Sequence, residues 1–121
     1  MKDTGPSPEV RRLVHARSGG ICERCRAARA VDIHHRRARG MGGSTVGWIN
    51  SPENLVDLCR KCHEWVEANF TAALATGWKI GLADSPLDVR IQPLVGGEWI
   101  PAATGGRWVY VPPDGDSPTW F

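Results

Sequence analysis

Four cysteines are the first residues in this chain whose type and spacing could do chemistry. They form two Cys-x-x-Cys pairs, Cys22 with Cys25 and Cys59 with Cys62, and 33 residues separate the pairs. Two such turns that face each other present four thiolates in a tetrahedron, which is the donor set of a structural zinc site. Sulfur then fills every coordination position, so we expect this zinc to hold the fold and to do no chemistry.

Disulfides and thiol redox chemistry are the alternatives for these cysteines. The chain has no apolar run long enough to cross a membrane, and its first residues lack the apolar core of a secretion signal. We therefore expect a cytoplasmic protein with no membrane partner, in a compartment where disulfides are rare. A thiol redox protein needs accessible cysteines of low pKa, and the second pair argues against one. Zinc is the favoured interpretation.

Two adjacent histidines lie between the cysteine pairs, in residues 31–37 (VDIHHRR). This stretch reads as a short strand, on which neighbouring side chains point to opposite faces. His34 and His35 should therefore have different roles. His63 follows Cys62 directly, so the zinc would hold His63 close to the histidine pair. One member of the pair could bind a second metal ion together with His63, and the other could accept a proton from water.

Positive charge is concentrated in the first half of the chain. Residues 1–63 carry a net charge of +6 and residues 64–121 a net charge of −4. Such asymmetry favours a polyanionic partner, most simply DNA. For any single basic residue, a solvated surface is the alternative. The residues expected to contact phosphates follow the histidine pair or lie in the second cysteine turn: Arg36, Arg37, Arg39, Arg60 and Lys61.

The elements that must position these residues are short. Ser7 as N-cap, Pro8, and the Gly19-Gly20 pair predict a helix over residues 7–20. His15, near the end of this helix, is expected to be structural or exposed rather than a metal ligand. Further along the chain, the patterns predict strands at 30–34 and 54–58, a loop over 36–52, and a helix over 63–77.

A different pattern begins after Gly77. Short apolar pieces broken by proline and glycine predict strands or extended segments at 78–80, 88–91, 98–101 and 107–111, the last two as a hairpin. Trp99, Trp108 and Trp120 could stack on bases, but packing against a small sheet is the better interpretation. We therefore expect a core over residues 1–77 and a β-rich extension over 78–121 packed on it.

The order of these motifs resembles the HNH endonucleases, most closely the four-cysteine, zinc-stapled branch of bacteria and their phages. The resemblance covers residues 20–70: Cys-x-x-Cys, His-His, a Gly-Gly loop, Asn-Leu and Cys-x-x-Cys-His. It implies an α+β fold with a ββα-metal element, in which two antiparallel strands, a long loop and a helix surround a divalent cation. The N-terminal helix and the β-rich extension would be additions to this element.

By this resemblance His34 and His63 are ligands of a catalytic divalent cation, and His35 is the general base. Asn54 would bond to the backbone of the loop and keep His35 oriented. The cation, Mg²⁺ or Mn²⁺ or another transition metal, would stabilise charge on the phosphate and on the leaving 3′ oxygen. Hydrolysis would leave 3′-hydroxyl and 5′-phosphate ends.

Two carboxylates near this site have open roles. Glu67 lies four residues after His63, on the same helix face, where some members carry a further histidine. It could complete the metal site or be an exposed residue. Asp32 lies two residues before His34, so it could fix a histidine tautomer or serve as an alternative ligand.

The expected function is a metal-dependent endonuclease that nicks or cuts DNA with little sequence selectivity. Phage DNA packaging with a terminase is one setting that the resemblance suggests. The alternative is a zinc-stapled DNA-binding module without catalysis. Zinc and charge fit both functions, whereas His34, His35, Asn54 and His63 in this order favour the nuclease.

Overall fold

This α+β protein consists of short helices and two small antiparallel sheets. The computed structural model describes residues 5–38, 47–102, 106–113 and 119–120. The helices are α1 (Pro8–Ser18), η1 (Pro52–Asn54, one 3₁₀ turn), α2 (Arg60–Ala68) and α3 (Phe70–Ala75). The strands are β1 (Asp32–His35), β2 (Leu55–Leu58), β3 (Glu98–Pro101), β4 (Trp108–Val111) and β5 (Thr119–Trp120). Among the described residues, no helix is both long enough and apolar enough to span a membrane.

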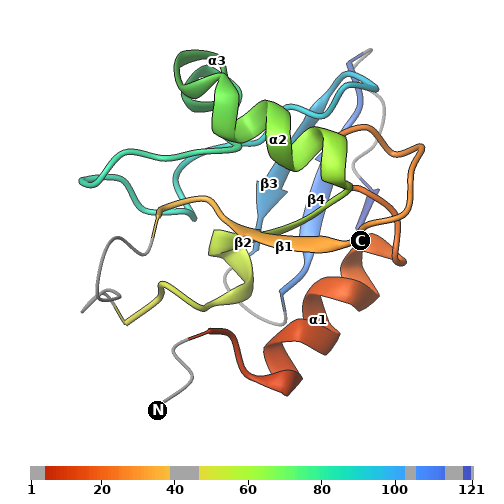
Figure 1. Ribbon diagram of the computed structural model, residues 1–121, viewed down its shortest axis with the longest axis vertical. Coiled ribbons are helices and arrows are strands. Elements are labelled where there is room, and N and C mark those ends of the chain that lie inside the picture. The colour runs from red at the N-terminus through yellow and green to blue at the C-terminus, as the bar shows by residue number, and fades with distance from the viewer. Residues whose placement is uncertain (1–4, 39–46, 103–105, 114–118, 121) are drawn as a thin grey trace.

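The sheet that carries the histidine pair consists of β1 and β2. The strands pair antiparallel, with His34 opposite Val56 and His35 opposite Leu55. Every residue of β2 is buried, because α1 and α2 lie on opposite sides of this strand pair (Figure 1). The two predicted strands are confirmed, within one or two residues at their ends.

Both predicted helices form, but the second is interrupted. Ser7 caps α1 by accepting a hydrogen bond from the amide of Val10, and Gly19 ends it with a φ of 68°. The second helix begins earlier than predicted, because the Sγ of Cys59 accepts from the amide of Cys62 and serves as its N-cap. It breaks at Asn69, whose backbone leaves the helical region with φ −123° and ψ 65°, while its side-chain amide donates to the carbonyl of Trp65.

The C-terminal part confirms the predicted hairpin, whereas the two other segments, which were expected to be strands or extended pieces, form no strand. β3 and β4 pair antiparallel, and β5 adds to β4. Residues 78–80 form no strand, and residues 88–91 contribute a single bridge, between Ile91 and Trp99. Trp99 and Trp108 are 3 % and 0 % exposed, with ring centroids 5.4 Å apart, so they pack the sheet as predicted and offer no stacking face.

One hydrophobic core joins the two predicted parts of the chain. Its members from before residue 77 include Val56, Leu58 and Val66, and those from after it include Trp78 and Ile91. The C-terminal segment is therefore packed against the elements that carry the histidines and cysteines.

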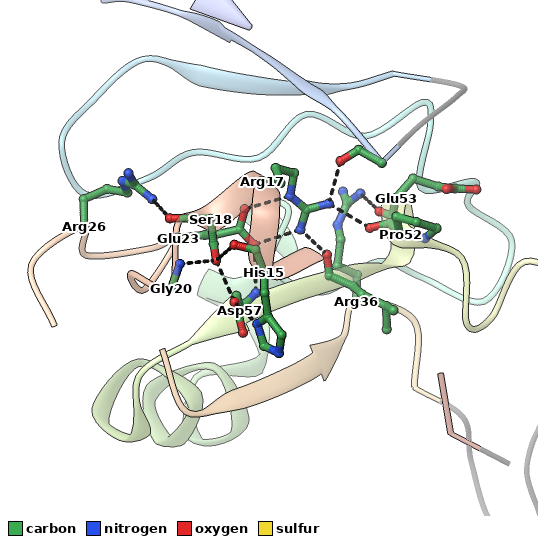
Figure 2. A network of polar contacts seen from close by, with 12 residues as sticks. His15, Arg17, Ser18, Gly20, Glu23, Arg26, Arg36, Pro52, Glu53 and Asp57 are labelled. Carbon is green, nitrogen blue, oxygen red and sulfur yellow. Dashed lines mark hydrogen bonds and ion pairs between the residues drawn. The ribbon is translucent and has the colours of Figure 1, made fainter. Parts of the chain in front are cut away.

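A buried ion pair ties α1, the first cysteine turn and the C-terminal sheet together (Figure 2). Arg17 donates to both carboxylate oxygens of Glu23 at 2.8 Å, and each side chain is 1 % exposed. Glu23 also accepts from the amide of Asp57 in β2. The Arg17 guanidinium lies 3.7 Å from the centroid of Trp108. This network holds the first cysteine turn against β2.

We expect the Glu23→Gln variant to lose about 3–5 kcal/mol of unfolding free energy, because it leaves the buried Arg17 charge without its partner. Urea denaturation followed by circular dichroism measures the loss. Glu98→Gln is the matched control: its partner Arg90 and Glu98 itself are 58 % and 36 % exposed, so its effect should stay below about 1 kcal/mol. Equal effects of the two substitutions would contradict the structural role of this ion pair.

Candidate functional site

The four cysteines gather into one cluster, as the sequence predicted. Their sulfur atoms all lie within 4.8 Å of one another, and Sγ of Cys25 is 4.0 Å from Sγ of Cys59. Tetrahedral zinc with Zn–S bonds of about 2.3 Å places its sulfurs about 3.8 Å apart. In each turn the amide of the second cysteine donates to the sulfur of the first. This cluster could hold a structural metal ion such as zinc.

The surroundings of the cysteine cluster fit a cation. Burial raises the pKa of the Cys62 thiol to about 12, although Arg24 donates to this sulfur at 3.4 Å and acts in the opposite direction. The Arg24 guanidinium also stacks on the ring of Trp65, 3.7 Å from its centroid. A divalent cation among the sulfurs would supply the charge that holds them as thiolates.

A second cluster with metal-ligand geometry lies where β1 meets α2. His34, His63 and Glu67 each offer a ligand atom, and the three atoms lie within 4.8 Å of one another. Oε1 of Glu67 is 3.4 Å from Nδ1 of His34 and 3.8 Å from Nε2 of His63. The two imidazole rings meet edge to face, with centroids 5.3 Å apart. Two imidazoles and one carboxylate are a donor set for a divalent transition metal.

The electrostatics keep the buried histidine of this cluster neutral. Burial lowers the pKa of His34 to about 3, and the charges of His63, Lys79 and His35 act in the same direction. A neutral imidazole is the form that binds metal. Asp32 lies 3.0 Å from Nδ1 of His63, which leaves Nε2 of that ring to face Glu67. Of the two roles considered for Asp32, fixing a histidine tautomer is the one its position fits.

His35 faces a different partner from its neighbour. Its Nε2 lies 2.7 Å from Oδ1 of Asn50, in the segment just before η1. With the amide oxygen as acceptor, His35 carries its proton on Nε2 and its lone pair on Nδ1. The sequence reasoning missed Asn50, because nothing in its type or spacing separates it from an ordinary loop asparagine.

Asn54 is fully buried and bonds to the backbone of the loop that follows β1. Its Oδ1 accepts from the amide of Arg37 at 2.8 Å, and its Nδ2 donates to the carbonyl of Ile49 at 2.8 Å. These two bonds join the chain after His35 to the chain before Asn50. The placement of Asn54 therefore agrees with the predicted contact to the loop backbone.

Arg36 was predicted to contact DNA, but it is buried, so this prediction is wrong. It is 1 % exposed, and its guanidinium donates to the carbonyls of Gly77, Glu53, Pro86 and Val89. Burial lowers its pKa to about 9. Side chains alternate along an extended chain, so Arg36 points to the same side as the buried His34. Arg36 thus ties the C-terminal segment to the histidine strand, and its burial keeps it from a phosphate on the surface.

The other predicted DNA contacts differ in their positions. Arg60 is 67 % exposed, pairs with Asp32 at 3.3 Å and lines a shallow depression beside His63. Lys61 is exposed on the first turn of α2. Arg37 is half-buried, with its guanidinium 5.7 Å from the centroid of Trp48. Arg39 lies outside the described residues.

A cleft of about 240 Å³ opens onto the second cluster. It is lined by Ile33, His34, His35, Ala38, His63, Glu67 and Lys79. The metal-ligand candidates and the proposed base thus share one opening. Lys79 is the second residue that the sequence reasoning missed, although it stands out as an isolated cation in the acidic half of the chain.

Comparison of this chain with protein-family models, with curated proteins and with solved structures finds no match.

Proposed function

We propose that this protein is a metal-dependent endonuclease that hydrolyses DNA phosphodiester bonds, with an HNH-type ββα-metal element formed by β1, β2 and α2. One observation carries the proposal: three metal-ligand atoms lie within 4.8 Å of one another, and His35 lines the same cleft. A DNA-binding module without catalysis has no use for a metal-ligand cluster beside a histidine oriented by an amide. The cysteine cluster serves as the staple that holds β1 and α2 together.

The chain's own residues account for the proton transfer in this reaction. Nδ1 of His35 takes one proton from a water as the water oxygen forms a bond to phosphorus and the bond from phosphorus to the 3′ oxygen breaks. Asn50 holds the imidazole by its Nε2 hydrogen, which also stabilises the imidazolium that forms. His34, His63 and Glu67 would hold a divalent cation, which supplies charge stabilisation for the phosphate and the leaving oxygen when bound. Solvent then protonates the 3′ oxygen.

The donor set bears on the choice of cation. Imidazole nitrogens suit transition metals, whereas Mg²⁺ prefers oxygen ligands in an octahedral site. With two imidazoles and one carboxylate, we expect faster cleavage with Mn²⁺ than with Mg²⁺ at equal concentration.

The test is a plasmid assay with purified protein whose zinc content matches a filled four-cysteine site. We expect conversion of supercoiled to nicked plasmid in Mn²⁺, and none after the divalent ion is omitted. Chelation with a matched excess of EDTA, added after Mn²⁺, controls for a contaminating metal-independent nuclease. Salt-sensitive DNA binding without cleavage in Mg²⁺, Mn²⁺, Co²⁺, Ni²⁺ or Zn²⁺ would contradict the nuclease and favour the binding module.

A further inference from the structure

Lys79 places a cation inside the cleft that holds the metal-ligand candidates. Its side chain is 15 % exposed, and its Nζ lies 3.4 Å from Oε2 of Glu67. The other oxygen of the same carboxylate, Oε1, faces Nδ1 of His34 and Nε2 of His63. One carboxylate therefore stands between the ammonium and the two imidazoles.

The backbone that carries Lys79 is fixed on both sides. Its own amide donates to the carbonyl of Ala73, and the next amide, of Ile80, donates to the carbonyl of Arg36. The preceding residue, Trp78, is fully buried and donates from its indole to the carbonyl of Gln92. Before it, Gly77 has a φ of 83°, and a Cβ there would lie 2.0 Å from the carbonyl oxygen of Arg90. The lysine is thus held in position by a packed segment.

An ion pair with Glu67 leaves much of this ammonium's bonding capacity unused. An ammonium has three donors, and among the described residues Glu67 provides its one hydrogen-bond acceptor. Glu67 itself is 54 % exposed, so a pair at this position contributes little to stability. Lys79 is half-buried and lines the cleft beside the metal-ligand cluster. This position suits it to bind an anionic group that enters the cleft.

We propose that Lys79 is a further catalytic residue, whose ammonium binds a non-bridging oxygen of the scissile phosphate. This inference rests on the proposed nuclease function. A phosphate oxygen carries the charge that the ammonium can accept, and this charge grows as the attacking water adds to phosphorus. With Glu67 facing the two imidazoles through Oε1, the entering phosphate provides the acceptors that the lysine lacks. The C-terminal segment would then supply a group to the reaction, in addition to packing against the core.

The test compares single-turnover plasmid nicking by the wild type, Lys79→Met, Lys79→Arg and Arg90→Gln in saturating Mn²⁺. Methionine keeps an unbranched stem near Phe70, whose ring centroid is 5.9 Å from Nζ. We expect Lys79→Met to lower the rate about 100-fold and Lys79→Arg to retain part of the activity. Arg90→Gln removes an exposed cation outside the cleft and should match the wild type. Thermal melts check that every variant is folded.

Titration of each variant with Mn²⁺ separates a contact to the substrate from an effect on the metal site. Removal of a cation beside the ligands should leave Mn²⁺ affinity unchanged or increase it. Weaker Mn²⁺ binding by Lys79→Met, with the rate restored at high Mn²⁺, would show that Lys79 only positions Glu67 and would overturn the proposal. A rate equal to that of the wild type would overturn it while the nuclease function stands. If the wild type cuts DNA with none of the metals, both proposals fail.

Discussion

The Cys59→Ser variant is expected to be unfolded at room temperature. A structural zinc site contributes about 10–16 kcal/mol of binding free energy at neutral pH, and a whole domain is stable by only about 5–15 kcal/mol. Cys59 is 7 % exposed and is also the N-cap of α2. Serine can still cap a helix, so the expected loss comes from the missing metal ligand. Circular dichroism should show loss of helix, and atomic absorption should show loss of bound zinc.

The control for this variant is Ala75→Ser, which adds a hydroxyl at an exposed position of α3. It should keep the wild-type zinc content and melting temperature within a few degrees. A Cys59→Ser protein that is folded, stable and free of zinc would contradict the claim that the cysteine cluster is a metal site on which folding depends.

If the protein is the proposed nuclease, His35→Ala should lower the rate of DNA cleavage by about 10²–10⁴-fold. It should leave the fold and both candidate metal clusters intact. In the proposed mechanism the imidazole takes the proton of the attacking water. Neither His35 nor its partner Asn50 belongs to the hydrophobic core, so the substitution should not destabilise the fold. Single-turnover nicking in saturating Mn²⁺ measures the loss of rate. Zinc content, Mn²⁺ affinity and melting temperature should match those of the wild type.

His15→Gln is the matched control, because it removes a different imidazole of the same chain. His15 bonds to the buried carboxylate of Asp57 through Nδ1 at 2.7 Å, and the glutamine side chain retains a donor for that contact. It should cleave DNA at the wild-type rate. Full activity in His35→Ala would exclude this histidine as the base, and an equal loss in both variants would indicate a general effect on the fold.

Local patterns predicted the elements that have clear end signals. Ser7 and Gly19 marked α1, and the strand hairpin of residues 98–111 followed from its apolar pieces and its glycines. The helix over 63–77 was predicted as one element, but its start depended on a cysteine acting as N-cap, and it breaks at the non-helical backbone of Asn69. Neither effect leaves a periodic signal. Residues 78–80 have strand-like composition, yet their bonding partners are the ends of other elements.

The residues of the candidate site were likewise predicted only where local spacing decides their placement. Spacing alone placed Cys22 beside Cys25 and Cys59 beside Cys62, because a tight turn fixes the distance between two cysteines whatever surrounds it. The fold brings the two turns together, as the expected zinc site required. Strand alternation separated His34 from His35. By contrast, a run of arginines carries no information on which member is buried, and Arg36 proved to be a structural residue.

The sequence by itself determined which functional groups this protein carries and on which elements they lie. These are four sulfurs in two turns, a histidine pair on a strand, and a histidine at the start of a helix. These follow from short-range geometry, in which covalent spacing fixes direction. The tertiary structure alone decided which side chains share the cleft. Asn50 reaches His35 from the segment before η1, and Lys79 reaches Glu67 from beyond the helices. Such contacts depend on how distant segments pack, and packing is set by the whole core rather than by any local pattern.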